Sequence, residues 1–262
     1  MTSAFERATT LSADGRGSVD ASWYQGRGAF GGIMAALLLR AMREKVAEPE
    51  RTPRSITVHF CGPATEGPID VRAEVVRSGS RVSHATARAM RDGETTTFAS
   101  ASFCKSRTGP SYALAKMPEV APPGGLPEIP RGMPGLPAFF EHVDARFAGP
   151  TLPFSASATP EIAAWVRLRE PAPVDAAVVA LLLDALPPAI TATFDAPRAV
   201  ASVDFTIHFF ERLPERAGAP DDFHLVAIRS RWADDGYTEE IRDLWSPSGV
   251  LLGQCRQLLA LL

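Results

Sequence analysis

The sequence predicts an α+β fold made of two similar units, each with an antiparallel sheet wrapped around one apolar helix. An alternating segment at residues 55–60 (SITVHF) reappears at residues 204–209 (DFTIHF). A helix-like apolar run precedes each copy, at residues 31–42 and 175–186, and strand-like sequence follows each copy. Such internal similarity is typical of chains built from repeated structural units.

The first unit begins with short extended or turn segments up to about residue 30. The run from Gly32 to Lys45 consists of helix formers and is apolar on nearly all sides until Arg40, which indicates a helix surrounded by other elements. Residues 55–60 alternate between apolar and polar side chains, the pattern of a strand with one buried face. Gly-containing turns separate the further strands that we expect at residues 69–76, 82–91 and 95–103.

A proline-rich linker divides the chain. Eight of the 23 prolines lie between residues 110 and 137. Proline has no N–H to donate to a strand ladder, so this stretch cannot form a regular sheet. We therefore expect an N-terminal unit at residues 1–108, a linker at 109–137 and a C-terminal unit at 138–262.

The second unit has its own apolar helix. Asp175 is suited to cap the start of this helix, and Pro187 and Pro188 stop it after Asp184. The strands that we expect are residues 143–147, 164–169, 201–210, 223–232, 238–245 and 250–261.

The bulk composition narrows the class of protein. A net charge of −3 and a pI near 6.0 give no reason to expect nucleic acid or an anionic membrane as a partner. The longest apolar stretches are about half the length of a membrane span, and residues 1–7 lack a signal-peptide profile. The three cysteines follow no disulfide or metal-ligand spacing. We expect a cytoplasmic protein with no membrane insertion and no metal.

The two apolar runs differ in one important respect, because only the second has a carboxylate in its body, at Asp184. Burying an unpaired carboxylate is costly, and burial raises its pKa toward the range of a general base. The alternative is an exposed aspartate in the last helical turn, where the helix dipole makes a negative charge mildly unfavourable.

Gly31 and Gly32 open the first helix. Free backbone N–H groups at a helix start would suit the oxygen of a reacting carbonyl as negative charge develops on it. The alternative is a tight turn in which the glycines adopt a positive φ.

Five short segments resemble the type II acyl-CoA thioesterases. They are Phe30-Gly31-Gly32, Trp165-Val166-Arg167, Asp184-Ala185-Leu186-Pro187, Ala201-Ser202-Val203-Asp204, and Gly249 to Leu252 leading on to Gln257. The resemblance extends from about residue 25 to 260 outside the linker. It implies a double hotdog fold, in which two fused hotdog units each wrap a sheet around a central helix.

The resemblance also implies an activity and a site. Members of that family hydrolyse acyl-CoA with a water molecule held by an aspartate, a serine or threonine, and a glutamine. By position these residues are Asp184, Ser202 and Gln257, while Phe30, Gly31 and Gly32 are expected to bind the substrate. No cofactor is implied, acyl-CoA is the expected partner, and hotdog sheets can pair further into homo-oligomers.

Two of these assignments leave an alternative open. Gln254 lies three residues before Gln257, and an offset of three in a strand places the two side chains on opposite faces. Strict alternation puts Ser202 on the same face as Asp204, so Ser202 reaches the helix side only from a strand end or a β-bulge.

Some positions differ from the family pattern. Phe205 and Phe210 stand in place of histidines, Ile33 in place of a glutamine, and Leu258-Leu259 in place of Glu-Gly. Two other functions therefore stay open, a hotdog hydratase or dehydratase and a non-catalytic acyl-CoA or lipid-binding protein. The former would need a well-placed helix histidine or an Asp/His pair, and neither predicted helix contains a histidine.

Overall fold

The computed structural model describes residues 2–262 and contains two central helices, as the sequence predicts. They are α2 (Gly31–Val46) and α3 (Ala176–Asp184). The Asp175 side chain accepts the N–H groups of Ala177 and Val178, which confirms its predicted capping role. The bounds agree with the expected ones to within one residue at either end of α2.

The strands follow the predicted ranges closely in both halves. In the N-terminal half they are β1 (Arg16–Val19), the short pair β2 (Tyr24–Gln25) and β3 (Gly28–Ala29), β4 (Thr52–Phe60), β5 (Gly67–Ser78), β6 (Val82–Arg91) and β7 (Glu94–Cys104). In the C-terminal half they are β8 (Val143–Pro150), β9 (Glu161–Leu168), β10 (Val200–Phe209), β11 (His224–Asp234), β12 (Tyr237–Trp245) and β13 (Leu251–Leu261). The hairpin turns at Asp92-Gly93 and Asp235-Gly236 both have positive φ at each residue, which suits tight two-residue turns.

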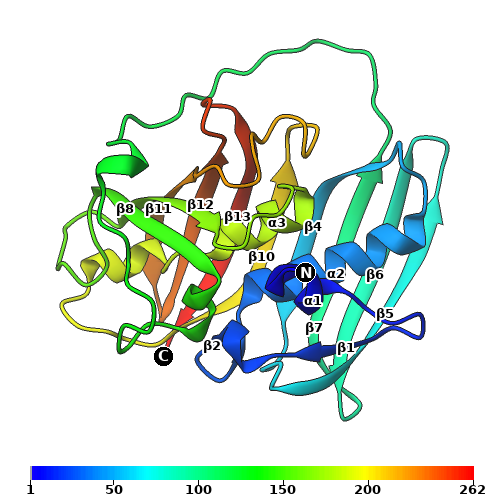
Figure 1. Ribbon diagram of the computed structural model, residues 1–262, viewed down its shortest axis with the longest axis horizontal. Helices are drawn as coiled ribbons and strands as arrows, with labels where there is room; N and C mark the ends of the chain where they lie inside the picture. Colours follow the sequence, from blue (N-terminus) through cyan, green and yellow to red (C-terminus); the bar gives the residue numbers. More distant parts are fainter. Residues whose placement is uncertain (1) are drawn as a thin grey trace.

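Within the described residues, eleven of these strands form one antiparallel sheet (Figure 1). Its order is β1-β5-β6-β7-β4-β10-β13-β12-β11-β9-β8. The halves meet where β4 pairs with β10, and on either side of this seam the strands follow in equivalent order. Both helices lie against the same side of the sheet, one for each half (Figure 1). The arrangement is the double hotdog fold that the sequence predicts.

An internal twofold axis passes through the seam. Thr57 of β4 pairs with Thr206 of β10, and their hydroxyl oxygens lie 3.0 Å apart. The two threonines are separated by 149 residues and hold the same place in the two copies of the repeated segment. On the outer face of the seam His59 pairs with Asp204 and His208 with Ser55, and both histidines are exposed.

The first thirty residues contain more structure than we expected. A helix, α1 (Ala4–Thr9), packs against α2, whereas the sequence indicated only extended or turn segments. The Ser3 hydroxyl accepts the N–H of Glu6 at its start, and the Phe5 side chain is 2% exposed. Tertiary burial of one aromatic ring therefore stabilises a helix too short to form alone.

The linker runs outside the protein body from the end of β7 to the C-terminal half (Figure 1). The indole N–H of Trp165 donates to the carbonyl of Ala121 at 2.8 Å, and Met117 and Val120 pack against the same aromatic cluster. The linker thus lies on the outer surface of the C-terminal sheet. The three-part division at residues 108 and 137 stays a prediction.

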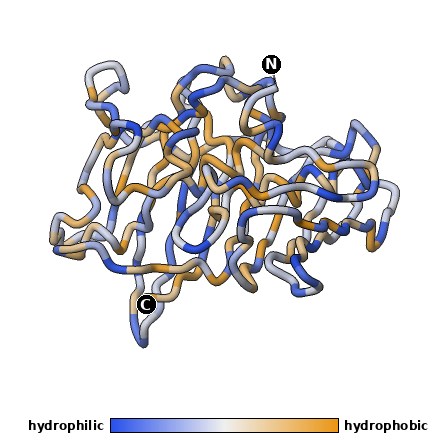
Figure 2. The backbone as a smooth tube through the Cα atoms, turned by 60° about the horizontal axis from the view of Figure 1, so that its bottom comes forward, coloured by the Kyte–Doolittle hydropathy of each residue, from blue (hydrophilic) through white to orange (hydrophobic). Residues whose placement is uncertain are grey.

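Apolar segments run through the middle of the molecule, and hydrophilic segments dominate the peripheral loops (Figure 2). The stretch Ala176–Thr193 has a mean hydropathy of 1.7, high enough for a membrane span, but 78% of it is buried inside the fold. Packing in the core accounts for its apolar character.

Candidate active site

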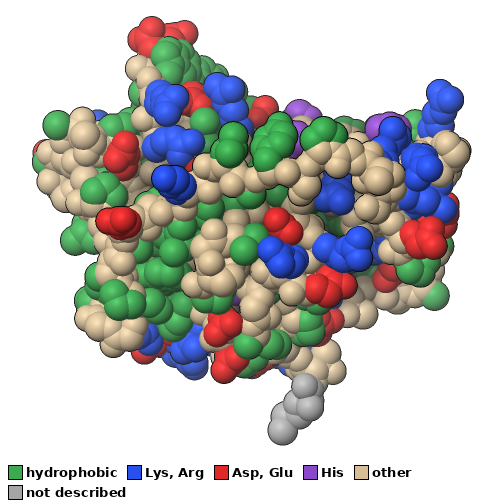
Figure 3. Space-filling model, turned by 90° about the horizontal axis from the view of Figure 1, so that it is seen from above, with side chains coloured by type: hydrophobic (Ala, Val, Ile, Leu, Met, Phe, Trp, Pro, Cys, Tyr) green, Lys and Arg blue, Asp and Glu red, His purple; other side chains and the backbone are tan. Residues whose placement is uncertain are grey.

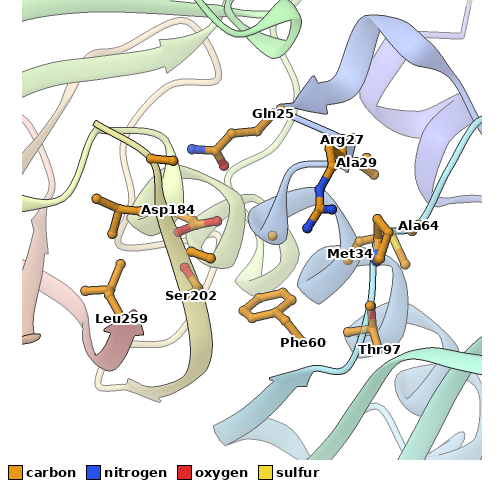
Figure 4. Close-up of a pocket in the computed structure, with 18 of the residues that line it drawn as sticks. Gln25, Arg27, Ala29, Met34, Phe60, Ala64, Thr97, Asp184, Ser202 and Leu259 are labelled. Carbon is orange, nitrogen blue, oxygen red and sulfur yellow. The ribbon is translucent and has the colours of Figure 1, made fainter. Parts of the chain in front are cut away.

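A cavity of about 570 Å³ lies between the two halves, at one end of the central helices. Its wall is formed by the β2–β3 hairpin, the start of α2, the end of β4, the end of α3 and the start of β10. Asp184 and Ser202 lie side by side on one wall, and the Phe60 ring lies opposite (Figure 4). Two of the three predicted catalytic residues are therefore brought together in one cavity.

Asp184 is the last residue of α3, and its side chain is 10% exposed. Burial raises the pKa of this carboxyl to about 6, against the lowering effects of the Arg242 charge and of a hydrogen bond from the Gly32 N–H. The carboxylate thus meets the N-terminal end of α2, where the helix dipole favours negative charge. A carboxyl with a pKa of about 6 is ionised at neutral pH and still basic enough to accept a proton from water.

Asp184 lies beside a buried ion-pair network formed by Arg242 and Glu240 of β12. Arg242 Nη1 lies 3.8 Å from Asp184 Oδ1 and donates to the carbonyls of Leu183 and Leu186 at the end of α3. Its Nε and Nη2 lie 2.6 Å from one oxygen of Glu240, which is fully buried. Arg242 therefore ties the end of α3 that contains Asp184 to the sheet and supplies a positive charge beside this carboxylate.

Gln257 belongs to this network but is absent from the residues that line the cavity. Its Nε2 donates to Glu240 at 2.5 Å, and its Oε1 has no hydrogen-bond partner within the described part of the chain. Gln254 faces away from Gln257, as the spacing predicts, and donates to Asp243 on the outer side. A direct role of Gln257 in holding water stays a prediction.

A β-bulge places Ser202. Ser202 pairs with Leu259 and Asp204 with Leu258, so Val203 is the extra residue in β10. The bulge shifts the alternation by one residue and places Ser202 on the inner face, while Asp204 stays on the outer face. The sequence allowed Ser202 to reach the helix side from a strand end or from a β-bulge, and in the structure a β-bulge places it there.

The glycines at the start of α2 serve close packing. A Cβ on Gly31 would lie 2.8 Å from Asp184 Oδ2 and 2.7 Å from the Phe60 ring, and one on Gly32 would lie 2.6 Å from the Phe30 ring. Neither glycine has a positive φ, so the alternative of a strained turn is wrong. Gly31 lines the cavity, whereas Phe30 is buried under the helix against Phe139.

The structure adds site residues that sequence reasoning missed. Gln25 and Arg27 of the β2–β3 hairpin and Phe60 at the end of β4 line the cavity (Figure 4). Arg242 belongs to the cavity lining as well. Phe60 also packs against Phe205, with ring centroids 5.4 Å apart. Gly26, between Gln25 and Arg27, has a φ of +68° and was a detectable turn signal, but nothing local connected this turn to Asp184.

Comparison with protein families agrees with this geometry. Residues 19–104 match the acyl-CoA thioesterase N-terminal domain, and residues 115–261 match the acyl-CoA thioesterase C-terminal domain. The chain belongs to the acyl-CoA thioesterase family. It is accordingly a thioester hydrolase, as the resemblance of its motifs implied.

Solved structures show the same fold over the full length of the chain. A protein of unknown function with a hot dog fold from Alicyclobacillus acidocaldarius is 32% identical, with a TM-score of 0.90, over 100% of this chain and 99% of its own. A protein from Thermobifida fusca proposed to be a thioesterase II is 23% identical, with a TM-score of 0.82, over 98% and 97% of the two chains. The acyl-CoA thioesterase II from Mycobacterium marinum is 22% identical, with a TM-score of 0.78, over 99% and 98%. No curated protein matches the sequence.

Proposed function

We propose that this thioesterase hydrolyses acyl-CoA by direct attack of a water molecule bound between Asp184 and Ser202. The observation that supports this most is a buried carboxyl with a pKa of about 6 on the wall of a cavity between the halves. Asp184 takes a proton from the water as its oxygen attacks the thioester carbonyl carbon. When the C–S bond breaks, the same carboxyl returns the proton to the departing CoA sulfur, giving a free acid and CoA.

The remaining cavity residues are assigned by their chemistry. Phe30, the N-cap residue of α2, offers no side-chain cap, and although the Gly32 N–H donates to Asp184, the dipole at this helix start also favours the negative charge that develops on the thioester oxygen. Met34, Phe60 and Leu259 supply an apolar wall for the acyl chain. We assign Gln257 an indirect role, in which it holds Glu240 and, through it, Arg242 beside Asp184.

The two rival functions fit the cavity less well. No histidine lies among the cavity-lining residues of the described chain, which disfavours a hydratase or dehydratase that needs one. A non-catalytic binding protein would have no use for a carboxylate buried beside the ligand, which costs folding free energy.

Release of free thiol from a panel of acyl-CoAs tests the proposal. We expect turnover by the wild type and a loss of about 10²–10⁴-fold in Asp184→Asn, the usual contribution of a general base. Asp195→Asn removes an exposed carboxylate elsewhere and serves as the matched control, with full activity expected. An active Asp184→Asn variant would eliminate Asp184 as the base, and release of no thiol from any substrate would eliminate hydrolysis.

A further inference from the structure

A second cavity of about 330 Å³ lies at the opposite end of the central helices. Parts of α2, α3, β4 and the turn after β10 form its wall. Half of its lining is apolar, from Leu39, Pro49, Pro53, Ala176, Ala177 and Leu213. The hydrolysis described above makes no use of it.

This cavity is the counterpart of the catalytic cavity under the internal twofold axis. Because Thr57 and Thr206 lie on the axis, they are equivalent positions of the two halves. A residue that lies a given number of positions before or after Thr57 therefore corresponds to the residue at the same number of positions before or after Thr206. Thr52, Pro53, Glu211 and Leu213 in the second cavity correspond in this way to Ala201, Ser202, Gly62 and Ala64 in the catalytic cavity. The bulge is repeated as well, since pairing in β4 shifts between Pro53 and Ser55.

The hydrolytic acid has no equivalent in the second cavity. Where Asp184 meets Gly31 at one end of the two helices, Arg40 meets Asp175 at the other end, with Nη2 3.4 Å from Oδ2. Glu6 of α1 binds both terminal nitrogens of Arg40 at 2.8 Å. The position of the base is thus held by a paired cation.

The carboxylates that line this cavity are also engaged. Asp175 Oδ1 accepts two backbone N–H groups as the cap of α3, and its Oδ2 faces Arg40. Glu211 lies 3.5 Å from the guanidinium of Arg216. Neither carboxylate is placed as Asp184 is, since their side chains are 41% and 29% exposed against 10% for Asp184.

A basic groove of about 520 Å³ continues from the second cavity, and the two share Pro49, Thr52 and Leu213. Its charged lining consists of Arg54, Arg81, Lys105 and Arg212, with Glu50 and Glu215. Arg54 and Arg81 contact backbone carbonyls, while Lys105 pairs with Glu48 and Glu50. Lys and Arg side chains gather on the right-hand side of this end of the molecule (Figure 3).

We propose that the second cavity binds acyl-CoA without hydrolysing it. An acyl-CoA has an apolar chain at one end and a nucleotide with several phosphate charges at the other. The apolar half of the cavity lining fits the chain, and the arginines of the adjoining groove fit the phosphates through charge-assisted hydrogen bonds. The internal symmetry places this cavity as it places the catalytic cavity, with Arg40 where the acid would be, whereas the groove arginines are particular to this end, since Val203 and Pro63 stand in the places of Arg54 and Arg212.

The number of ligands bound per chain tests this proposal. We would titrate the wild-type protein with non-hydrolysable thioether analogues of short-, medium- and long-chain acyl-CoAs. Isothermal titration calorimetry would give the number of molecules bound per chain. We expect two molecules per chain. A stoichiometry of one with every analogue would overturn the proposal.

Two variants locate the second molecule. Leu213→Trp fills the second cavity, so we expect one bound molecule and an unchanged hydrolysis rate. Arg212→Glu acts on an exposed side chain and leaves the core intact. It should weaken one of the two binding events about tenfold or more, as expected for a lost charge-assisted contact. Arg72→Glu on β5 makes the same charge change outside both cavities and should alter neither event.

Two further outcomes separate this proposal from the proposed hydrolysis. A second molecule that is insensitive to both Leu213→Trp and Arg212→Glu binds elsewhere, and the proposal is then wrong. Two-site binding by a protein without thiol release would refute the catalytic roles alone and leave this proposal supported.

Discussion

Asp184 and Arg242 form a pair in which only one member could be predicted from the sequence. A carboxylate inside an apolar helix stands out against its neighbours. Arg242 and Glu240 do not, because the alternation of residues 237–245 would place Ile241 and Trp245 inside. In the structure Glu240 and Arg242 are 0% and 1% exposed, and partners from α3 and β13 satisfy them. Tertiary pairing overrides the binary pattern here.

The pH dependence of hydrolysis follows from the Asp184 pKa. In the proposed mechanism the ionised form takes the proton from water, so kcat/KM should rise with pH through about 6 and level off above that value. The double variant Arg242→Met/Glu240→Gln removes one positive and one negative charge from the buried network. Arg242 lowers the pKa of Asp184 by more than Glu240 raises it, so the pKa should be higher in this variant. We expect its inflection at higher pH. A pH–rate profile checks both statements, and an unshifted inflection would show that Arg242 does not tune the acid.

The elements themselves were largely predictable. Both central helices, the Asp175 cap and the strands lie close to their expected ranges, because periodicity and turn residues are local signals. The bulge at Val203 could be stated only as one option, since it depends on pairing with β13. Helix α1 was missed because burial of Phe5, rather than local pattern, stabilises it.

The contact between the start of α2 and the end of α3 sets the site geometry. Gly31→Ala introduces a Cβ 2.7–2.8 Å from Phe60 and the Asp184 carboxylate, so one of them must move. We expect kcat to fall about tenfold or more, since small misplacements of reacting groups are costly, and stability to fall by about 1–3 kcal/mol. Steady-state kinetics and thermal unfolding measure these effects.

Gly124→Ala in the linker is the matched control, because its Cβ would meet no atom within 4 Å. Its activity should equal that of the wild type. Wild-type kcat in Gly31→Ala would mean that the helix contact does not position the acid.

At the scale of the whole molecule, the seam between β4 and β10 and the helix pair hold the halves together, while the linker passes outside. The repeat in the sequence predicted two units. It could not show that the units share one sheet, because strand pairing across them is a long-range contact.

A cut in the linker should therefore leave the protein assembled. Tyr112 and Leu114 are each 81% exposed and offer sites to chymotrypsin under native conditions. We expect two fragments on a denaturing gel, one species of unchanged size by gel filtration, and retained hydrolysis. Separation of the fragments without denaturant would show that the linker, rather than the seam, holds the halves.

The hydroxyl pair of Thr57 and Thr206 has a wider consequence. In a homodimer of identical units an isologous interface must be self-complementary, so any change in one subunit appears in both. Only a residue on the axis meets its own copy, whereas His59 faces Asp204 and its counterpart His208 faces Ser55. In a single chain the two halves are free to differ at every position, and the threonine pair is a place where they have stayed alike. This freedom allows an acid to evolve at one end of the helices and an arginine at the other.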